Sequence, residues 1–181
     1  MKLFFISDLH GSLPATERVL DKYKASGANY LVILGDVLNH GPRNPVPQGY
    51  QPAAVAQLLN NYKDEILAVR GNCDSEVDQM LLEFPMLETY SWILLENGIR
   101  IFLTHGHLYN SDHRPPLKNG DVLAYGHTHI PVAEKNGDQF IYNPGSITFP
   151  KEGYAASYGL FEDGMFTVRS FSDEILKQVH I

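Results

Sequence analysis

Carboxylate, imidazole and amide side chains recur directly after short apolar runs in the first two thirds of the chain. Carboxylate and imidazole together form a ligand set that suits manganese, iron, zinc and nickel. Seven residues of these types are candidate metal ligands: Asp8, His10, Asp36, Asn72, His105, His127 and His129. They are too many for one ion that must keep an open position, whereas two ions that share one carboxylate would use them all.

The apolar runs themselves predict buried strands at 2–7, 30–35 and 65–71. Amphipathic helical patterns lie between them: one starts with Ser12 as a candidate N-cap and ends at Gly27, and the other starts at Pro52. This β-α-β-α-β order predicts a parallel sheet with right-handed crossovers. Because ligands bind at the carboxyl ends of parallel strands, the polar residues that follow these three strands are expected at one edge.

The second half of the chain has the alternation and the turns that are typical of hairpins. Glu-Asn-Gly separates two strand-like runs at 96–98, and Asn-Gly and Asp-Gly turns follow at 136–137 and 163–164. Five of the eight histidines, counting His107, directly follow predicted strands. We therefore expect two packed sheets flanked by helices.

Taken singly, these residues signal little, because Asp, Gly and His are common in turns. Cys73, the only cysteine, lies beside Asn72 in the segment "GNCD". Its position alone leaves three interpretations open: a nucleophile, a metal ligand or a small residue at the end of a strand.

Composition narrows the class of protein. The chain has 181 residues, of which 44% are hydrophobic and 19% charged, as expected of one globular domain that spans residues 1–181. One cysteine allows no intramolecular disulfide, and the N-terminus lacks the pattern of a secretory leader, so we expect a cytoplasmic protein. No apolar run is long enough to span a membrane. The net charge of -7 argues against stable binding of nucleic acid.

The polar residues also occur in an ordered set of motifs: "DLHG" at 8–11, "GD" at 35–36, "GNCD" at 71–74, "THGH" at 104–107, "GHTH" at 126–129 and "NPGS" at 143–146. This set resembles the calcineurin-like metallophosphoesterase superfamily, and within it the short bacterial phosphodiesterases of the YfcE type. The resemblance implies an α/β fold, a four-layer α/β/β/α sandwich with two mixed β-sheets.

The resemblance assigns the seven candidate ligands to two ions: Asp8, His10 and His129 to one, Asn72, His105 and His127 to the other, and Asp36 to both. Manganese is the expected metal, with iron, zinc and nickel as alternatives. Two such ions can share a hydroxide that attacks phosphorus in line with the leaving group. The expected activity is hydrolysis of a small phosphodiester, with Asp36 and Asn72 also serving catalysis.

Three further residues are candidate participants in catalysis. His107 could contact substrate oxygens, and Arg43, in the Pro- and Gly-rich loop 40–52, offers a planar fork for a phosphate. Cys73 occupies the position where many members of the superfamily have a histidine, and a thiol is a poor general acid at neutral pH. We therefore expect Cys73 to be neither ligand nor nucleophile.

Two other functions remain open at this stage. The same site could hydrolyse phosphomonoesters, or the chain could be a non-catalytic interaction module, as is one retromer subunit of this fold. We also expect a homo-oligomer, because exposed hairpin edges in the second half could pair with another copy.

Overall fold

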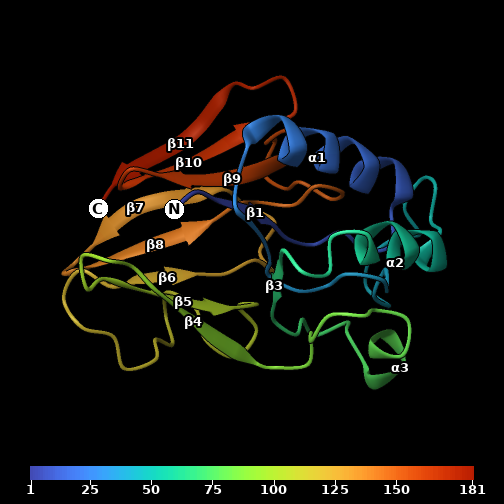
Figure 1. Cartoon of the computed structure of the whole chain (residues 1–181), viewed down its shortest axis with the longest axis horizontal. Coiled ribbons are helices and arrows are strands. Elements are labelled where there is room, and N and C mark those ends of the chain that lie inside the picture. The colour runs from blue at the N-terminus through green and yellow to red at the C-terminus, as the bar shows by residue number, and fades with distance from the viewer.

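Two β-sheets stack face to face in the structure, a computed structural model that describes residues 1–181 (Figure 1). The first sheet has the strand order β11 (Ile175–His180), β10 (Met165–Ser170), β9 (Ser157–Glu162), β1 (Leu3–Ile6), β2 (Tyr30–Ile33) and β3 (Ile66–Ala68). The second has the order β4 (Tyr90–Leu94), β5 (Arg100–Thr104), β6 (Val122–Ala124), β8 (Gln139–Asn143) and β7 (Val132–Asn136). Each combines parallel and antiparallel pairs, so the expected α/β fold with two mixed sheets is confirmed.

Strand β1 shows how the sequence divides the core into layers. Phe4 and Ile6 point to the helices, whereas Leu3 and Phe5 point to the second sheet. This alternation follows from the two-residue period of a strand, and all four side chains are fully buried. The parallel pairing of β1, β2 and β3 and the three hairpins were expected from the sequence, but β11 was not.

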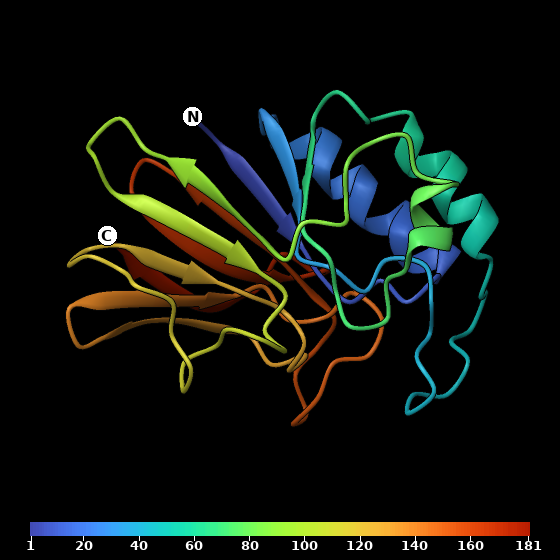
Figure 2. The same cartoon turned by 90° about the horizontal axis from the view of Figure 1, so that it is seen from below.

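The helices lie on the outer face of the first sheet and beside its carboxyl-end loops (Figures 1 and 2): α1 (Leu13–Ser26), α2 (Pro52–Asn60) and α3 (Glu76–Gln79). Pro14 lies in the first turn of α1, and Gly27 ends it in the left-handed conformation, as expected. Ser12 occupies the N-cap position, but its hydroxyl donates to the carbonyl of Gln48 and makes no capping bond. No helix has the length and apolar character that crossing a membrane would require.

The fourth layer differs from the expectation drawn from the resemblance. The outer face of the second sheet carries the cluster Phe102, Leu123, Tyr125 and Ile141, and the side chains that cover it include Tyr109 and Leu117. These two residues belong to the segment 105–121, which contains no helix. An irregular segment rich in Pro and Gly therefore takes the place of a helical layer on this side.

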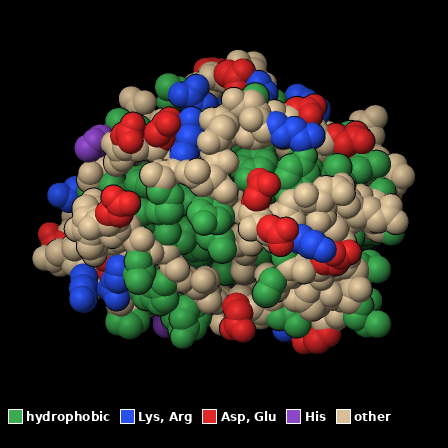
Figure 3. Space-filling model, in the orientation of Figure 1, with side chains coloured by type: hydrophobic (Ala, Val, Ile, Leu, Met, Phe, Trp, Pro, Cys, Tyr) green, Lys and Arg blue, Asp and Glu red, His purple; other side chains and the backbone are tan.

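Charged side chains of both signs are interspersed on the face shown in Figure 3. That face has no continuous basic stripe that could track a phosphate backbone.

Candidate metal centre

The loops that follow β1, β2, β3, β5 and β6 converge where the carboxyl ends of the two sheets meet. Backbone hydrogen bonds join these loops: the amide of His10 donates to the carbonyl of Asp36, and the amide of Gly126 donates to that of His105. All seven candidate ligands lie in these loops: Asp8, His10, Asp36, Asn72, His105, His127 and His129.

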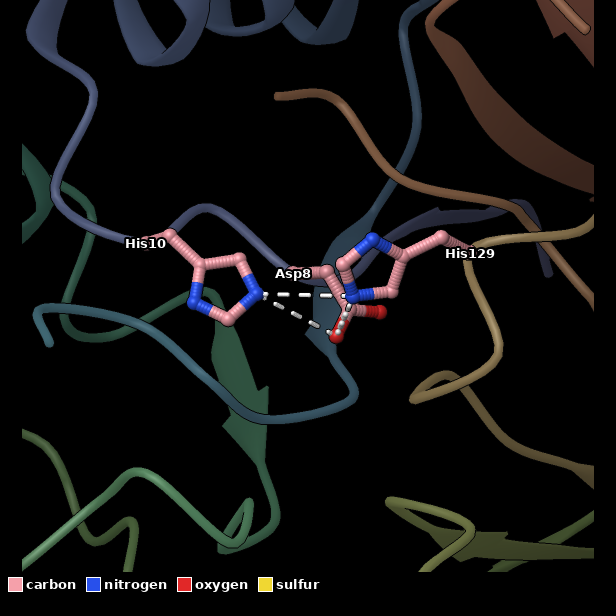
Figure 4. A group of neighbouring side chains, drawn as sticks. All are labelled: Asp8, His10 and His129. Carbon is pink, nitrogen blue, oxygen red and sulfur yellow. Dashed lines mark hydrogen bonds and ion pairs between the residues drawn. The ribbon is translucent and has the colours of Figure 1, made fainter. Parts of the chain in front are cut away.

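A first group of candidate ligands consists of Asp8, His10 and His129 (Figure 4). All three side chains are buried. Oδ1 of Asp8 lies 3.1 Å from Nε2 of His129 and 3.7 Å from Nε2 of His10, and the two Nε2 atoms are 3.5 Å apart. Three atoms with available lone pairs thus face a common point.

A second group lies around Asp36 and contains His105, His127 and Asn72. Oδ2 of Asp36 is 3.3 Å from Nε2 of His105 and 3.8 Å from Nε2 of His10. Oδ1 of Asn72 is 3.1 Å from the same Nε2 of His105. Asp36 therefore lies between the two groups, as a bridging ligand must.

Backbone carbonyls fix three of the imidazole rings. Nδ1 of His10 bonds to the carbonyl of Asn39 at 2.9 Å, Nδ1 of His105 to that of Leu34 at 2.6 Å and Nδ1 of His129 to that of Phe149 at 2.7 Å. Because the carbonyl requires a proton on Nδ1, each neutral ring presents its Nε2 lone pair to the centre. This arrangement is typical of metal-binding histidines.

Five of the seven residues have a left-handed backbone conformation, which residues other than glycine rarely adopt. They are Asp8, His10, Asp36, His127 and His129, with φ between 50° and 63°. Each such residue costs on the order of 1–3 kcal/mol, so the fold tolerates strain to aim these side chains. Neighbouring glycines make room for them. A Cβ on Gly71 would lie 2.1 Å from Oδ1 of Asp36, and one on Gly126 would lie 1.8 Å from the hydroxyl of Ser7.

The electrostatics favour positive charge at the centre. Burial raises the pKa of Asp8 and Asp36, but the surrounding histidines outweigh burial and hold both pKa values below the ordinary 3.8. Burial lowers the pKa of His10 and His127. For His105, burial lowers the pKa, whereas Asp36 and Asp8 raise it, with a balance at about 9. The carboxylates therefore keep a proton on His105 at neutral pH. A divalent cation that bound at this place would displace the proton.

One buried atom provides a direct test of whether a cation fits. Oδ2 of Asp8 accepts hydrogen bonds from the hydroxyl of Ser7 at 2.7 Å and the amide of His127 at 3.0 Å. Oδ1 of Asp8, which faces the histidines, is buried and accepts none. An unpartnered buried carboxylate oxygen is costly unless a cation binds it, so the donor set fits a divalent metal ion.

A cavity of about 440 Å³ opens beside both groups of ligands. Its lining includes four of the ligands together with Asn44, Gly41 and Pro42. Arg43 and Cys73, two of the candidate participants, also line it. The sequence analysis missed Lys151, a further lining residue, because no motif surrounds it.

Cys73 and His107 lie close to the ligands in different ways. The thiol of Cys73 lies within 4.8 Å of ligand atoms of His10 and Asp36. Burial and the charge of Asp36 raise the pKa of Cys73 to about 12, so its thiolate is disfavoured. The ring of His107 lies 5.5 Å from that of His105, outside the cavity lining, with a buried Nδ1 that has no partner. His113, which lies in none of the motifs, is exposed and stacks on Tyr109.

Sequence reasoning also missed the residues that hold the ligand loops in place. The buried carboxylate of Asp74 accepts hydrogen bonds from the amides of Asp36, Val37 and Gly71 at 2.7–2.8 Å. In the segment "NPGS", Asn143 donates to the carbonyl of Gly126 and Ser146 to that of Asp8. The available signal for Asn143 and Ser146 was the motif "NPGS" itself, and for Asp74 it was a carboxylate directly after "GNC".

Comparison with known proteins agrees with this geometry. The model of the calcineurin-like phosphoesterase superfamily domain matches residues 1–163. The chain is 57% identical to the phosphodiesterase YfcE of Escherichia coli K12 over 182 aligned residues, which cover 100% of this chain and 98% of the relative.

Two solved structures are similar to this fold. One, described as YfcE, a phosphoesterase from E. coli, superposes with a TM-score of 0.98 at 56% identity and covers 100% of both chains. The other, Vps29 of Entamoeba histolytica complexed with zinc, covers 99% of both chains with a TM-score of 0.64, but at 20% identity it shows the fold alone. The family model matches most of the chain, and a relative is 57% identical over its full length. This chain therefore belongs to the calcineurin-like phosphoesterase superfamily.

Proposed function

We propose that this protein is a phosphodiesterase with two divalent metal ions that share Asp36. Asp8, His10 and His129 would hold one ion, and Asn72, His105 and His127 the other. The observation that carries the proposal is Oδ1 of Asp8, buried without a hydrogen-bond partner and facing the Nε2 atoms of two histidines whose Nδ1 atoms are already bonded. The similarity to a phosphodiesterase over the full chain supports the same reaction.

Two bound cations would supply the hydroxide nucleophile and offset the charge that develops on phosphorus. The chain's own residues position that chemistry. Asp36 accepts the amide of Cys73 through Oδ1 at 2.8 Å, which leaves Oδ2 to face His105 and His10. Asn72 contributes an oxygen without adding negative charge. Cys73, with a raised pKa, would fill space beside Asp36 and would neither attack phosphorus nor ligate a metal.

His107 and Arg43 have separate parts in this proposal. His107 would help to orient His105 and His127, whose rings lie 5.5 Å and 6.3 Å away. Arg43, on the wall of the cavity, would contact the substrate. Manganese is the proposed metal, and iron, zinc or nickel would also suit the oxygen and nitrogen donors. We also propose a cytoplasmic homo-oligomer, for which the exposed Tyr90 and Leu94 on the edge strand β4 offer a pairing surface.

The test combines metal analysis of the purified protein with assays of bis-(4-nitrophenyl) phosphate and 4-nitrophenyl phosphate. Two metal ions per chain and faster turnover of the diester would support the proposal. Faster turnover of the monoester would identify a phosphomonoesterase, and absence of both activities with metal bound would favour an interaction module.

A further inference from the structure

We infer that Arg43 and Lys151 form a subsite for a second anionic group of the substrate. The substrate would then be a small phosphodiester that carries a carboxylate or a phosphate on one of its alcohol groups. This inference rests on the proposed function and specifies the class of diester.

The side chains of Arg43 and Lys151 reach the cavity from different parts of the chain. Arg43 lies in the loop between β2 and α2, and Lys151 in the loop between β8 and β9. Both line the same cavity as Asp36, His127 and His129. Neither side chain forms an ion pair or a hydrogen bond within the protein, so both charges are free for a ligand. The amide of Lys151 donates to the carbonyl of His129 at 3.3 Å, which holds this residue close to a metal ligand.

The rest of the lining points to a polar substrate. Pro42 and Cys73 are the only residues with apolar side chains in the cavity lining, and its only aromatic rings are the imidazoles of the candidate ligands His127 and His129. Recognition of a nucleobase usually depends on stacking against an aromatic ring or a similar apolar face. This cavity therefore suits a substrate whose alcohol groups are small and polar better than it suits a nucleotide.

Charge indicates what Arg43 and Lys151 bind. Two divalent ions, the carboxylates of Asp8 and Asp36 and a bridging hydroxide leave a net charge of roughly +1, which the single charge of a diester phosphate balances. Arg43 and Lys151 add two positive charges that such a phosphate leaves unbalanced. The chain as a whole carries a net charge of -7, so this positive excess is local to the cavity. A second anion on the substrate would pair with it.

The experiment compares two 4-nitrophenyl phosphodiesters that differ by one charge. In one the second alcohol is glycolate, and in the other it is glycolamide, which has nearly the same shape but no carboxylate. We expect a lower KM for the glycolate ester, and we expect 0.5 M salt to reduce this preference. Calorimetric dissociation constants for the inert phosphonate analogues should show the same preference without turnover. A third ester with a terminal phosphate tells which anion binds better.

Variants identify the residues responsible. Lys151→Ala and Arg43→Ala should each reduce the preference for glycolate over glycolamide by roughly 3- to 10-fold, as expected for a partly exposed charge pair. The control is Lys118→Ala, since Lys118 is an exposed lysine without an ion pair over the outer face of the second sheet, and this change should alter neither ester.

The experiment distinguishes a failure of the anion subsite from a failure of the proposed function. If neither ester is hydrolysed while metal is bound, the proposed function is wrong. If both esters are hydrolysed and bound equally well, the phosphodiesterase stands and the anion subsite is wrong. A loss confined to 4-nitrophenyl phosphate in Lys151→Ala would also overturn the subsite, because it would assign this charge to a phosphomonoester.

Discussion

The two halves of the proposed metal centre differ in how rigidly their side chains are held. In the first half, Asp8, His10 and His129 are all buried, and carbonyls fix both rings. In the second half His105 is held in the same way, but Asn72 is exposed, and the half-buried ring of His127 has no hydrogen-bond partner. Ordering mobile side chains costs free energy when a ligand binds. The first half should therefore bind its ion more tightly, while the second opens towards the cavity where substrate enters.

Asp36→Asn should have the largest effect, because Asp36 contributes to both halves. We expect a loss of turnover of roughly 10³-fold or more, since the affinity for both metal ions would fall together. The fold should persist, because an amide can still accept the bond from the amide of Cys73. The measurements are metal content and diester turnover, with circular dichroism as the test of folding. Near-normal turnover with two ions bound would contradict the proposal that both ions share Asp36.

His129→Ala and His127→Ala test the difference between the halves directly. We expect His129→Ala to lose the tightly bound ion and His127→Ala to lose the weakly bound one, with each affinity falling more than about 100-fold. Equilibrium dialysis against increasing manganese distinguishes the two variants, and His113→Ala is the control, since that exposed ring stacks on Tyr109. Identical binding curves for the two metal-site variants would contradict the asymmetry.

Asp74→Asn should affect the centre through the backbone. Asp74 holds the amides of Asp36, Val37 and Gly71, so the change removes one acceptor oxygen from a buried cluster of donors. We expect metal affinity to fall by about 10- to 100-fold. The matched control is Asp121→Asn, since Asp121 is also buried and accepts the amides of Arg100 and Lys118, away from the metal centre. Asp121→Asn should lower the melting temperature and leave metal affinity unchanged.

The control Asp121→Asn should also show a dependence of its melting temperature on pH. Burial raises the pKa of Asp121, but Arg100 outweighs burial and keeps the pKa below the ordinary 3.8. A depressed folded-state pKa means that the stabilisation is present above pH 3.8 and is lost as pH falls below it. The difference in melting temperature between wild type and Asp121→Asn should therefore shrink at low pH. A constant difference down to about pH 3 would assign the effect to packing.

Cys73 substitutions should have the smallest effect. Cys73→Ala should keep metal content and leave turnover within about one order of magnitude, because a thiol with a raised pKa is a weak acid at neutral pH. Cys73→His should raise turnover of an alkyl ester relative to a nitrophenyl ester, since only the poor leaving group needs a proton. The ratio of these two rates across neutral pH is the measurement. Loss of all activity in Cys73→Ala would instead make the thiol a participant.

The sequence predicted the strands and the polar residues at their ends because both depend on local chemistry. Apolar runs specify β1, β2 and β3, and ligand residues follow each of them. The sequence did not predict the left-handed backbone of Asp8, His10 and Asp36, because no glycine marks these positions and long-range hydrogen bonds impose the conformation. Nor did it predict Lys151, which reaches the cavity only through tertiary folding.

The fourth layer shows the limit of arguing from resemblance. The motifs contain the seven candidate metal ligands, and the structure brings these residues together as expected. They say nothing of the segment 108–121, where Pro115, Pro116 and Gly120 accompany an irregular cover over Phe102 and Tyr125. Core side chains can be covered by any segment with suitable apolar residues, so this layer is free to vary while the site is kept.

The central claim is that two ions share Asp36, and a manganese titration of chelator-treated protein followed by electron paramagnetic resonance tests it most directly. The account predicts two ions per chain that bind in two steps, with an uncoupled signal after the first and an exchange-coupled pair after the second. The first ion should be retained in His127→Ala. Binding of a single ion, or of two ions that remain magnetically uncoupled, would contradict the account.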